Sequence, residues 1–370
     1  MTSTPRELGY HMPAEWEQQS AVWLQWPHRL PTTTVGGEDA HYSYQRKLET
    51  IWLAMSWEIH QHEKVCIIAN DDNHAAYITS QLNYYGYNMD SIDIHVAATY
   101  DVWHRDSGPI FVRNAEGELA VTGWNFNGWG TYPEYIENEQ HIPAKVAEIL
   151  ELPFFKAPIV SEGGALEVNG SGSLIATRSS LINDNRNPGK SQAEIETALK
   201  DYLGVSNIIW LSGAPPEVCM DELGDGTDFH IDIAARFVNQ NTVVYAWTDD
   251  TSDPRYPYLK QHREELQQAR DENGESLNLV PLELPRGGVY ATSGRFNEYG
   301  SNHTDSSYCN YLVANNLVLV PIFGNINDQK ALDTLKEFFP ERKVIGIPAL
   351  SINEEGGAIH CVTQQQPATR

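Results

Sequence analysis

The residues best suited to chemistry lie near the end of the chain, where a cysteine follows a histidine in residues 354–364 (EEGGAIHCVTQ). This stretch repeats residues 162–168 (EGGALEV), and Cys361 falls where the earlier copy has Val168. A thiolate is the strongest ordinary nucleophile of a protein near neutral pH. A repeated scaffold with a thiol in one copy therefore indicates a symmetric fold in which one module supplies a nucleophile.

Four earlier polar residues stand at similar positions of the other repeats: Asp106, Glu162, His230 and Asp232. Each has an ordinary structural explanation alone. Asp106 suits a turn, Glu162 suits a solvated loop, and a cysteine such as Cys361 is commonly a buried inert thiol. His230 and Asp232, two residues apart, are expected on one face of a strand. Because each repeat offers a chemically useful residue, the ordinary explanations weaken when the set is taken together.

The elements that must position these residues recur along the chain. Four times, a polar motif precedes a β-like run, a short polar turn and a second β-like run, which is the hairpin signature. The paired runs are 110–112 with 119–121, 165–168 with 174–176, 234–238 with 243–245, and 311–313 with 317–320. Helix-like segments lie between them at 144–150, 192–202, 258–272 and 328–339. Each polar motif is expected to start the inner strand of its module.

A fifth copy of the module begins at the Cys361 motif, and the chain ends before the second strand of that copy. The strand-like residues 21–26 are expected to complete it, since an unpaired edge strand is a liability. The sequence therefore predicts an α/β fold, a closed five-module α/β propeller of pseudo-fivefold ββαβ repeats. Residues 1–370 would form a single catalytic domain, with the polar motifs converging near the axis of the ring.

The composition narrows the possible partners. The chain has 370 residues, 41% of them hydrophobic, and a formal net charge of -25. Such an acidic surface repels nucleic acid and anionic membranes, and it attracts cationic ligands. No segment approaches the roughly 20 apolar residues of a membrane span. We expect a small cationic partner, no nucleic acid and no membrane, while a homo-oligomer is left open.

The cysteines indicate a reducing compartment. Cys66, Cys219, Cys309 and Cys361 are dispersed, without a C-x-x-C pair, which argues against a disulfide scaffold and a structural zinc site. The N-terminal residues lack an apolar run of signal-peptide length. We expect a cytoplasmic protein.

A site with three carboxylates, a histidine and a cysteine limits the possible chemistry. A metal site would favour closely spaced ligands such as H-x-x-x-H, which the sequence lacks. A cysteine protease does not need two further carboxylates, and acids near a thiolate disfavour it by raising its pKa. The additional carboxylates suit a cationic substrate such as a guanidinium, which binds carboxylates through paired hydrogen bonds. The histidine would protonate the departing ammonia and then activate a water.

The chain resembles the guanidino-group-modifying superfamily and, within it, the agmatine deiminase and bacterial peptidylarginine deiminase-like family. The resemblance runs through nearly the whole length and rests on an ordered set of motifs. They are MPAEW at 12–16, WLQWP at 23–27, WHRDSGP at 103–109, NFNGWG at 125–130, EGG at 162–164, NRNP at 185–188, HID at 230–232, SYCNY at 307–311 and GGAIHCVTQQ at 356–365. The family fold is a five-module α/β propeller.

The resemblance implies hydrolytic deimination through an S-alkylthiouronium intermediate, with no metal or organic cofactor. Cys361 matches the nucleophile, and His230 matches the general acid and base. Asp106 and Asp232 match the carboxylates that grip the guanidinium, and Glu162 matches the acid that orients the histidine.

The resemblance also puts Trp103, Asn310 and Gly357 at substrate-binding positions. The chain departs from the family beside the HID motif, where Phe229 and Ile233 stand in place of the usual Gly and Asn. Phe229 either reshapes the pocket or fills the core. These differences leave the chemistry intact and bear on the choice of substrate.

The expected substrate is agmatine, converted to N-carbamoylputrescine and ammonia, because the acidic composition suits a molecule with two cationic ends. The alternative is peptidylarginine or free arginine, deiminated by the same chemistry. An extracellular peptidylarginine deiminase would need an export signal. A Cys-His hydrolase, an amidinotransferase and an inactive binding ring are further alternatives, and binding of a guanidinium without ammonia release would favour the last.

Overall fold

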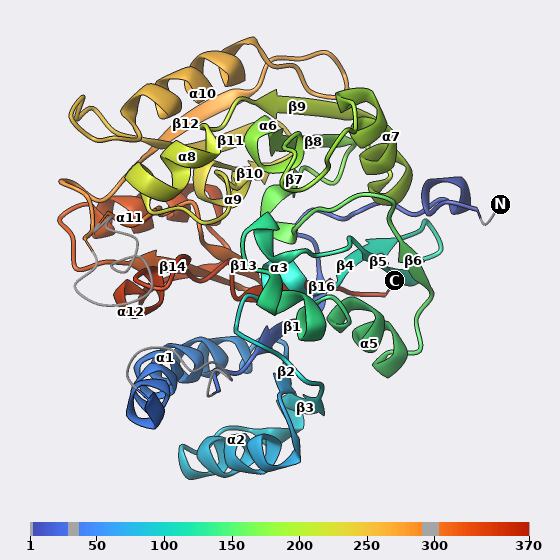
Figure 1. The fold of residues 1–370 in the computed structure, drawn as a ribbon, viewed down its shortest axis with the longest axis vertical. Coiled ribbons are helices and arrows are strands. Elements are labelled where there is room, and N and C mark those ends of the chain that lie inside the picture. The colour runs from blue at the N-terminus through green and yellow to red at the C-terminus, as the bar shows by residue number, and fades with distance from the viewer. Residues whose placement is uncertain (1–2, 29–36, 291–302, 370) are drawn as a thin grey trace.

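The computed structural model describes residues 3–28, 37–290 and 303–369. In these ranges the strands form five small sheets, four with three strands and one with four. Figure 1 shows the first strands of the hairpins near the middle of the molecule, with the third strands and the helices farther out. The fold is thus of the α/β class, as the sequence predicts.

The four three-stranded sheets share one topology, in which the first strand is antiparallel to the second and the second is parallel to the third. Their strands are β4 (Ile110–Arg113), β5 (Leu119–Gly123) and β6 (Phe154–Lys156); β7 (Glu167–Val168), β8 (Ser173–Thr177) and β9 (Asn207–Leu211); β10 (Ala235–Asn239), β11 (Thr242–Trp247) and β12 (Asn278–Glu283); and β13 (Leu312–Ala314), β14 (Leu317–Ile322) and β15 (Lys343–Pro348). A helix joins the second and third strands of each sheet, because a parallel pair needs a crossover.

These crossover helices are α5 (Ile142–Ile149), α7 (Gln192–Leu203), α10 (Tyr256–Gln268) and α11 (Asp328–Phe338). The four predicted helices are therefore confirmed, and so is the ββαβ order. Helix α10 ends four residues before its predicted end at residue 272. The carboxylate of Asp271 accepts hydrogen bonds from the backbone N–H groups of Asn273 and Glu275, which stabilises a turn there instead of a helix.

Helix α7 shows how local sequence sets the bounds of an element. The hydroxyl of Ser191 accepts from the backbone N–H of Glu194, whose carboxylate accepts from the N–H of Ser191, forming a capping box. Gly204 ends the helix with φ of 67°, a conformation that glycine adopts without steric cost. Between these caps, Ile195 and Leu199 are four residues apart and both buried, so one face of the helix packs on its sheet.

The four-stranded sheet joins the two ends of the chain. Its order is β16 (Thr363–Pro367), β1 (Gln19–Gln25), β2 (Lys64–Ala69) and β3 (Ile92–Val96). Strand β1 pairs antiparallel with β16, with Trp23 opposite Gln364, and parallel with β2. The N-terminal strand thus completes the last module, as predicted.

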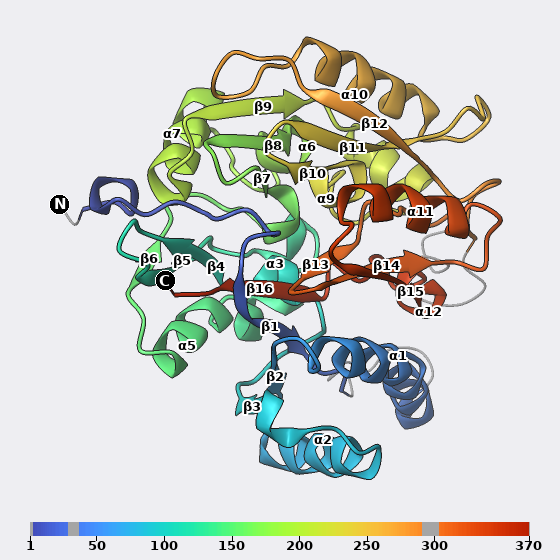
Figure 2. The same cartoon turned by 180° about the vertical axis from the view of Figure 1, so that it is seen from behind.

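Two helices absent from the sequence prediction belong to this sheet's connections. They are α1 (Gly37–Ile59), between β1 and β2, and α2 (Asp72–Tyr84), between β2 and β3. Figures 1 and 2 show α1, α2, β2 and β3 together on one side of the molecule. In the described part of the chain, no helix has both the length and the apolar character needed to cross a membrane.

The polar motifs lie in short helical turns ahead of the strands, not on them. These turns are α3 (His104–Ser107) before β4, the 3-10 turn η5 (Gly163–Ala165) before β7, and α9 (Ile231–Ala234) before β10. The expected strand at 165–168 accordingly shortens to Glu167–Val168.

The prediction that His230 and Asp232 share a strand face is wrong. His230 is the N-cap of α9, and the backbone N–H of Ala235 bonds to the carbonyl of Ile231. The carbonyl of Ile233 accepts from the hydroxyl of Ser307 instead of from a neighbouring strand, and the strand ladder begins only at Ala235.

Candidate active site

The structure brings together all five residues predicted to carry out the chemistry, and each of them is at least 95% buried. They are Asp106, Glu162, His230, Asp232 and Cys361. Asp106 lies in α3, Glu162 precedes η5, His230 and Asp232 belong to the α9 turn, and Cys361 lies just ahead of β16.

The sulfur of Cys361 contacts two polar side chains. The Asn310 side-chain amide donates to Sγ at 3.1 Å, and Oδ2 of Asp232 lies 3.7 Å from Sγ. The Asn310 Oδ1 atom accepts from the backbone N–H groups of His360 and Cys361, at 3.0 and 3.3 Å. Asn310 therefore holds the turn that carries the thiol, and it touches the sulfur directly.

The His230 ring lies between two carboxylates. Its Nε2 is 3.4 Å from Oε2 of Glu162, and its Nδ1 is 3.6 Å from Oδ1 of Asp106. Burial alone would lower the pKa of His230, but Asp106 and Glu162 outweigh that effect and raise the pKa to about 9. The imidazole is thus held in its protonated form near neutral pH.

Glu162 is anchored from its other side by Arg186, whose Nε donates to Oε1 at 2.7 Å. Burial opposes ionisation of Glu162, but Arg186 and His230 outweigh burial and lower the pKa of this carboxyl. Arg186 in turn pairs with Asp228 at 2.8 Å. The sequence analysis assigned no role to Arg186, although it lies within the NRNP motif.

The two carboxylates expected to grip a guanidinium are both oriented by donors. Asp106 accepts from Trp129 Nε1 at 2.9 Å and from the backbone N–H of Gly164 at 3.1 Å. Burial raises the pKa of Asp106 to about 6, against the opposing effect of His230. Asp232 contacts Nδ1 of His360 at 2.8 Å, and this contact outweighs burial and lowers the pKa of Asp232.

Several polar atoms of this site are buried without a hydrogen-bond partner among the described residues. They are Oδ1 of Asp232, Oε2 of Glu162 and both ring nitrogens of His230. Unpartnered buried polar atoms are uncommon in proteins, because each loses its bonds to water. A guanidinium carries five N–H donors in a planar fork and can satisfy carboxylate oxygens placed in this way.

Two glycines of the repeated Gly-Gly pairs are required by close contacts. A Cβ on Gly164 would lie 2.6 Å from Nδ1 of His230 and 2.8 Å from Oδ1 of Asp106. A Cβ on Gly357 would lie 2.5 Å from Cζ3 of Trp103 and 3.1 Å from Sγ of Cys361. Gly357 therefore keeps the space beside the nucleophile open.

A pocket opens onto the sulfur. Its described lining residues are Trp103, Asp106, Trp129, Tyr132, Gly226, Thr227, Glu355, Gly356 and Cys361. Trp103 lies in the wall, as predicted for a substrate-binding residue, and Trp129 adds a second indole that the sequence analysis did not assign. Aromatic faces attract cations, so these walls favour a positively charged ligand.

Phe229 lies in the core and is not among the described residues that line the pocket. Its ring packs perpendicular to His262 at 5.0 Å between centroids. Its φ of 66° is in the left-handed region that favours glycine, which explains why Gly suits this position in the family. Of the two interpretations of Phe229, filling of the core is the one observed.

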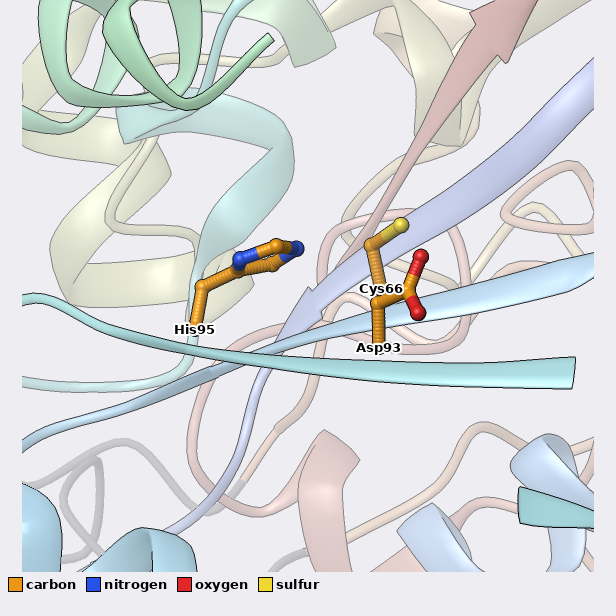
Figure 3. A group of neighbouring side chains, drawn as sticks. All are labelled: Cys66, Asp93 and His95. Atoms are coloured by element: carbon orange, nitrogen blue, oxygen red, sulfur yellow. The ribbon is translucent and has the colours of Figure 1, made fainter. Parts of the chain in front are cut away.

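A separate group of possible metal ligands lies outside this site. Cys66, Asp93 and His95, from strands β2 and β3, have ligand atoms within 4.8 Å of one another (Figure 3). Asp93 already pairs with Lys64 at 2.5 Å. Three donors, one of them engaged, are one short of the four protein ligands of a structural zinc site.

Comparison with known proteins agrees with this geometry. The chain belongs to the Porphyromonas-type peptidyl-arginine deiminase family, whose model matches residues 11–367. It is 35% identical to the agmatine deiminase of Pseudomonas syringae pv. tomato, covering 100% of this chain and 98% of the relative. It is 33% identical to the agmatine deiminase of Ectopseudomonas mendocina, with the same coverage. The structure of the Enterococcus faecalis agmatine deiminase aligns with a TM-score of 0.82 at 27% identity, covering 100% of this chain and 99% of that one.

Replacement of Gly357 by alanine tests the space beside the sulfur. The added methyl group would push against Trp103 and the thiol, so we expect kcat/KM for a guanidine substrate to fall roughly a hundredfold, the cost of displacing a reacting group by about 1 Å. Gly346→Ala is the control, because Gly346 also lies outside the left-handed φ region and a Cβ there meets only the Ile322 side chain, which is not among the described pocket residues. Equal activity of the two variants would contradict the close contact.

The protonation of Cys361 can be measured directly. Burial, Asp232 and Asp106 raise the pKa of this thiol well above its ordinary value, so the free enzyme holds a thiol near neutral pH. Asp232→Asn removes one negative charge and should lower the pKa of Cys361. Thiolate absorbance against pH, with the Cys361→Ser signal subtracted, checks this. An unchanged or higher pKa in Asp232→Asn would overturn the assignment.

Proposed function

We propose that this protein is an agmatine deiminase, which hydrolyses the guanidinium of agmatine to N-carbamoylputrescine and ammonia through a covalent intermediate on Cys361. One observation carries the proposal: a buried thiol shares its site with carboxylates and a protonated histidine, and Oδ1 of Asp232, Oε2 of Glu162 and both ring nitrogens of His230 have no described hydrogen-bond partner. The family membership and the named relatives support the same chemistry.

In this mechanism Asp106 and Asp232 bind the guanidinium from two sides and hold its central carbon in front of the sulfur. The bound cation offsets the carboxylates that raise the pKa of the Cys361 thiol, so the thiol releases its proton to solvent and becomes the thiolate. The thiolate attacks the central carbon and forms a tetrahedral adduct. His230, which is held protonated, gives its proton to one nitrogen, and the C–N bond breaks to release ammonia.

The product of that step is an S-alkylthiouronium, with the remaining carbon bound to sulfur. His230, now neutral, takes a proton from a water that attacks this carbon. The C–S bond then breaks, the hydroxyl proton of the adduct passes to the sulfur, the thiol is regenerated and a ureido product leaves the site. Glu162, anchored by Arg186, keeps the imidazole oriented and stabilises its charged form in both half-reactions.

The pocket walls favour agmatine over free arginine. Free arginine carries an α-carboxylate, which would need a cationic partner. No Lys or Arg is among the described residues that line the pocket, whereas Glu355 is. Glu355 pairs with Lys47 at 3.1 Å, so its charge is partly offset, but an α-carboxylate would still find no cation among the described lining residues.

The alternative is deimination of peptidylarginine or free arginine by the same residues. The observation in its favour is the description of the matching family, which names peptidyl-arginine deiminases. A peptide-linked arginine has no α-carboxylate of its own, so the charge argument against free arginine does not apply to it.

We further propose that the five sheets close into a single five-module ring and that residues 1–370 act as one catalytic domain. The antiparallel pairing of β1 with β16 supports closure, because it builds the fifth ββαβ unit from the two ends of the chain. We also propose a cytoplasmic location, which the free thiols of all four cysteines support.

The substrate and the nucleophile can be tested in one experiment. Ammonia release is measured from agmatine, free arginine and a blocked arginine peptide, with wild type and Cys361→Ser side by side. We expect release from agmatine alone, complete loss in Cys361→Ser, and retained agmatine binding in that variant. Activity on arginine or the peptide would overturn the substrate assignment, and substantial activity of Cys361→Ser would overturn the role of the thiol.

Asp106 and Asp232 form the proposed carboxylate clamp. Replacing either one by asparagine, which is neutral and of equal size, should therefore strongly reduce activity. We expect Asp106→Asn and Asp232→Asn each to lower kcat/KM for agmatine by at least about a hundredfold, roughly 3 kcal/mol of transition-state stabilisation. Asp253→Asn is a suitable control, since this carboxylate pairs with Arg255 and has no described hydrogen bond or ion pair with His230 or Cys361. Near-normal kinetics of either clamp variant would rule out the two-sided grip.

A further inference from the structure

A second histidine, His360, links the candidate active site to the N-terminal segment. Its Nδ1 lies 2.8 Å from Oδ2 of Asp232, and its Nε2 lies 2.9 Å from Oε2 of Glu15. All three side chains are buried. Because His360 directly precedes Cys361, the contact connects Glu15 with both the thiol and its neighbouring carboxylate.

Glu15 is held firmly in this position. Nη2 of Arg236 donates to its Oε2 at 2.7 Å, and the backbone N–H of Val313 donates to its Oε1 at 2.7 Å. Arg105 approaches the same carboxylate at 4.0 Å. Burial opposes ionisation of Glu15, but Arg236 and His360 outweigh it and lower the pKa of Glu15. Glu15 is thus a fixed, ionised carboxylate.

The two contacts of His360 constrain its protonation. An ionised carboxylate can only accept hydrogen bonds, so both contacts are satisfied only when both ring nitrogens carry a proton. Burial, Arg105 and Arg236 oppose this charged form and lower the pKa of His360, whereas Glu15 and Asp232 favour it. Without Glu15, the balance around the ring shifts toward the neutral form.

Charges of both signs surround His360: Glu15 and Asp232 contact its ring, and Arg236 and Arg105 approach Glu15. Burial raises the pKa of the nearby Glu167 to about 7, so this carboxylate is only partly ionised near neutral pH. Buried charges are tolerated when they are paired and hydrogen-bonded.

We propose that Glu15 is a positioning residue for the deimination reaction and that it acts through His360 on the orientation of Asp232. His360 engages Oδ2 of Asp232 and leaves Oδ1, which has no described partner, to bind the guanidinium. Glu15 itself touches neither the substrate pocket nor the thiol among the described contacts. The inference rests on the proposed function, because it assumes that Asp232 grips the substrate.

The chain offers a matched control within the same buried network. Glu167 also pairs with Arg236, through Nε at 2.6 Å, and accepts from the backbone N–H of Phe237 at 2.8 Å. No described hydrogen bond joins Glu167 to His360. Glu167→Gln should therefore perturb the stability of the network as Glu15→Gln does, without acting on Asp232.

The experiment measures the Kd of agmatine in the Cys361→Ser background, where binding is separated from turnover, and kcat/KM in the active enzyme. Glu15→Gln and His360→Gln should each raise the Kd and lower kcat/KM by about tenfold, the loss of one oriented charge-assisted hydrogen bond. Because both substitutions act through the same contacts, the Kd of agmatine in the double variant should be no higher than in the single variant that binds less tightly. Glu167→Gln should lower Tm while leaving the Kd within about twofold.

Two results would overturn the positioning role. One is an unchanged Kd in Glu15→Gln and His360→Gln while the wild type releases ammonia from agmatine. The other is that Glu167→Gln raises the Kd as much as Glu15→Gln does while the two variants lose the same amount of Tm. The network would then have only a structural role. If Glu15→Gln does not fold, His360→Gln decides alone. Failure of the proposed function would be distinguishable from failure of the positioning role, because the wild type would then release no ammonia from any guanidine tested.

Discussion

Repulsion among buried acids governs this site. Asp106, Glu162 and Asp232 lie with a thiol in a region that is almost closed to water, where each negative charge raises the energy of the others. Arg186 and His230 neutralise part of this charge, yet the pKa of Asp106 and that of Cys361 stay above their ordinary values. A bound cation would offset this charge, which is why a guanidinium suits the proposed site.

The repeated modules make this concentration of charge possible. Each hairpin is preceded by a short helical turn, and the turns before β4, β7 and β10 bring their acids and histidine to the same place. Glycines allow the turns to approach closely, since a side chain on Gly164 would collide with two members of the site. The helices and the outer strands contribute packing, which holds these turns against the repulsion of the charges they carry.

Much of this arrangement could be predicted from the sequence, because polar turns between β-branched runs mark hairpins and the recurring motifs mark equivalent positions. The five residues of the site were predicted correctly as neighbours, while their roles stay predictions. The local form of the HID motif was missed, since a strand and a one-turn helix share the same short pattern.

The partners of the predicted residues were also missed, for a physical reason. Trp129 contacts Asp106 across 23 positions, Arg186 contacts Glu162 across 24, and Glu15 contacts His360 across 345. Such contacts follow from tertiary packing, which no local periodicity encodes. The family motifs contained all of these residues, but they did not say which pairs would meet.

The pairing of β1 with β16 has a consequence for how the protein is made. During synthesis β1 emerges more than 300 residues before β16, so this edge of β1 stays unpaired until β16 has been made. Cys361 lies two residues before β16, so the thiol is next to this strand pair. A contact so distant in sequence forms late and slowly, since the closure of a long loop must come first. A chain that has not yet reached β16 also lacks Cys361, so the thiol joins the other site residues only when this late pairing can form.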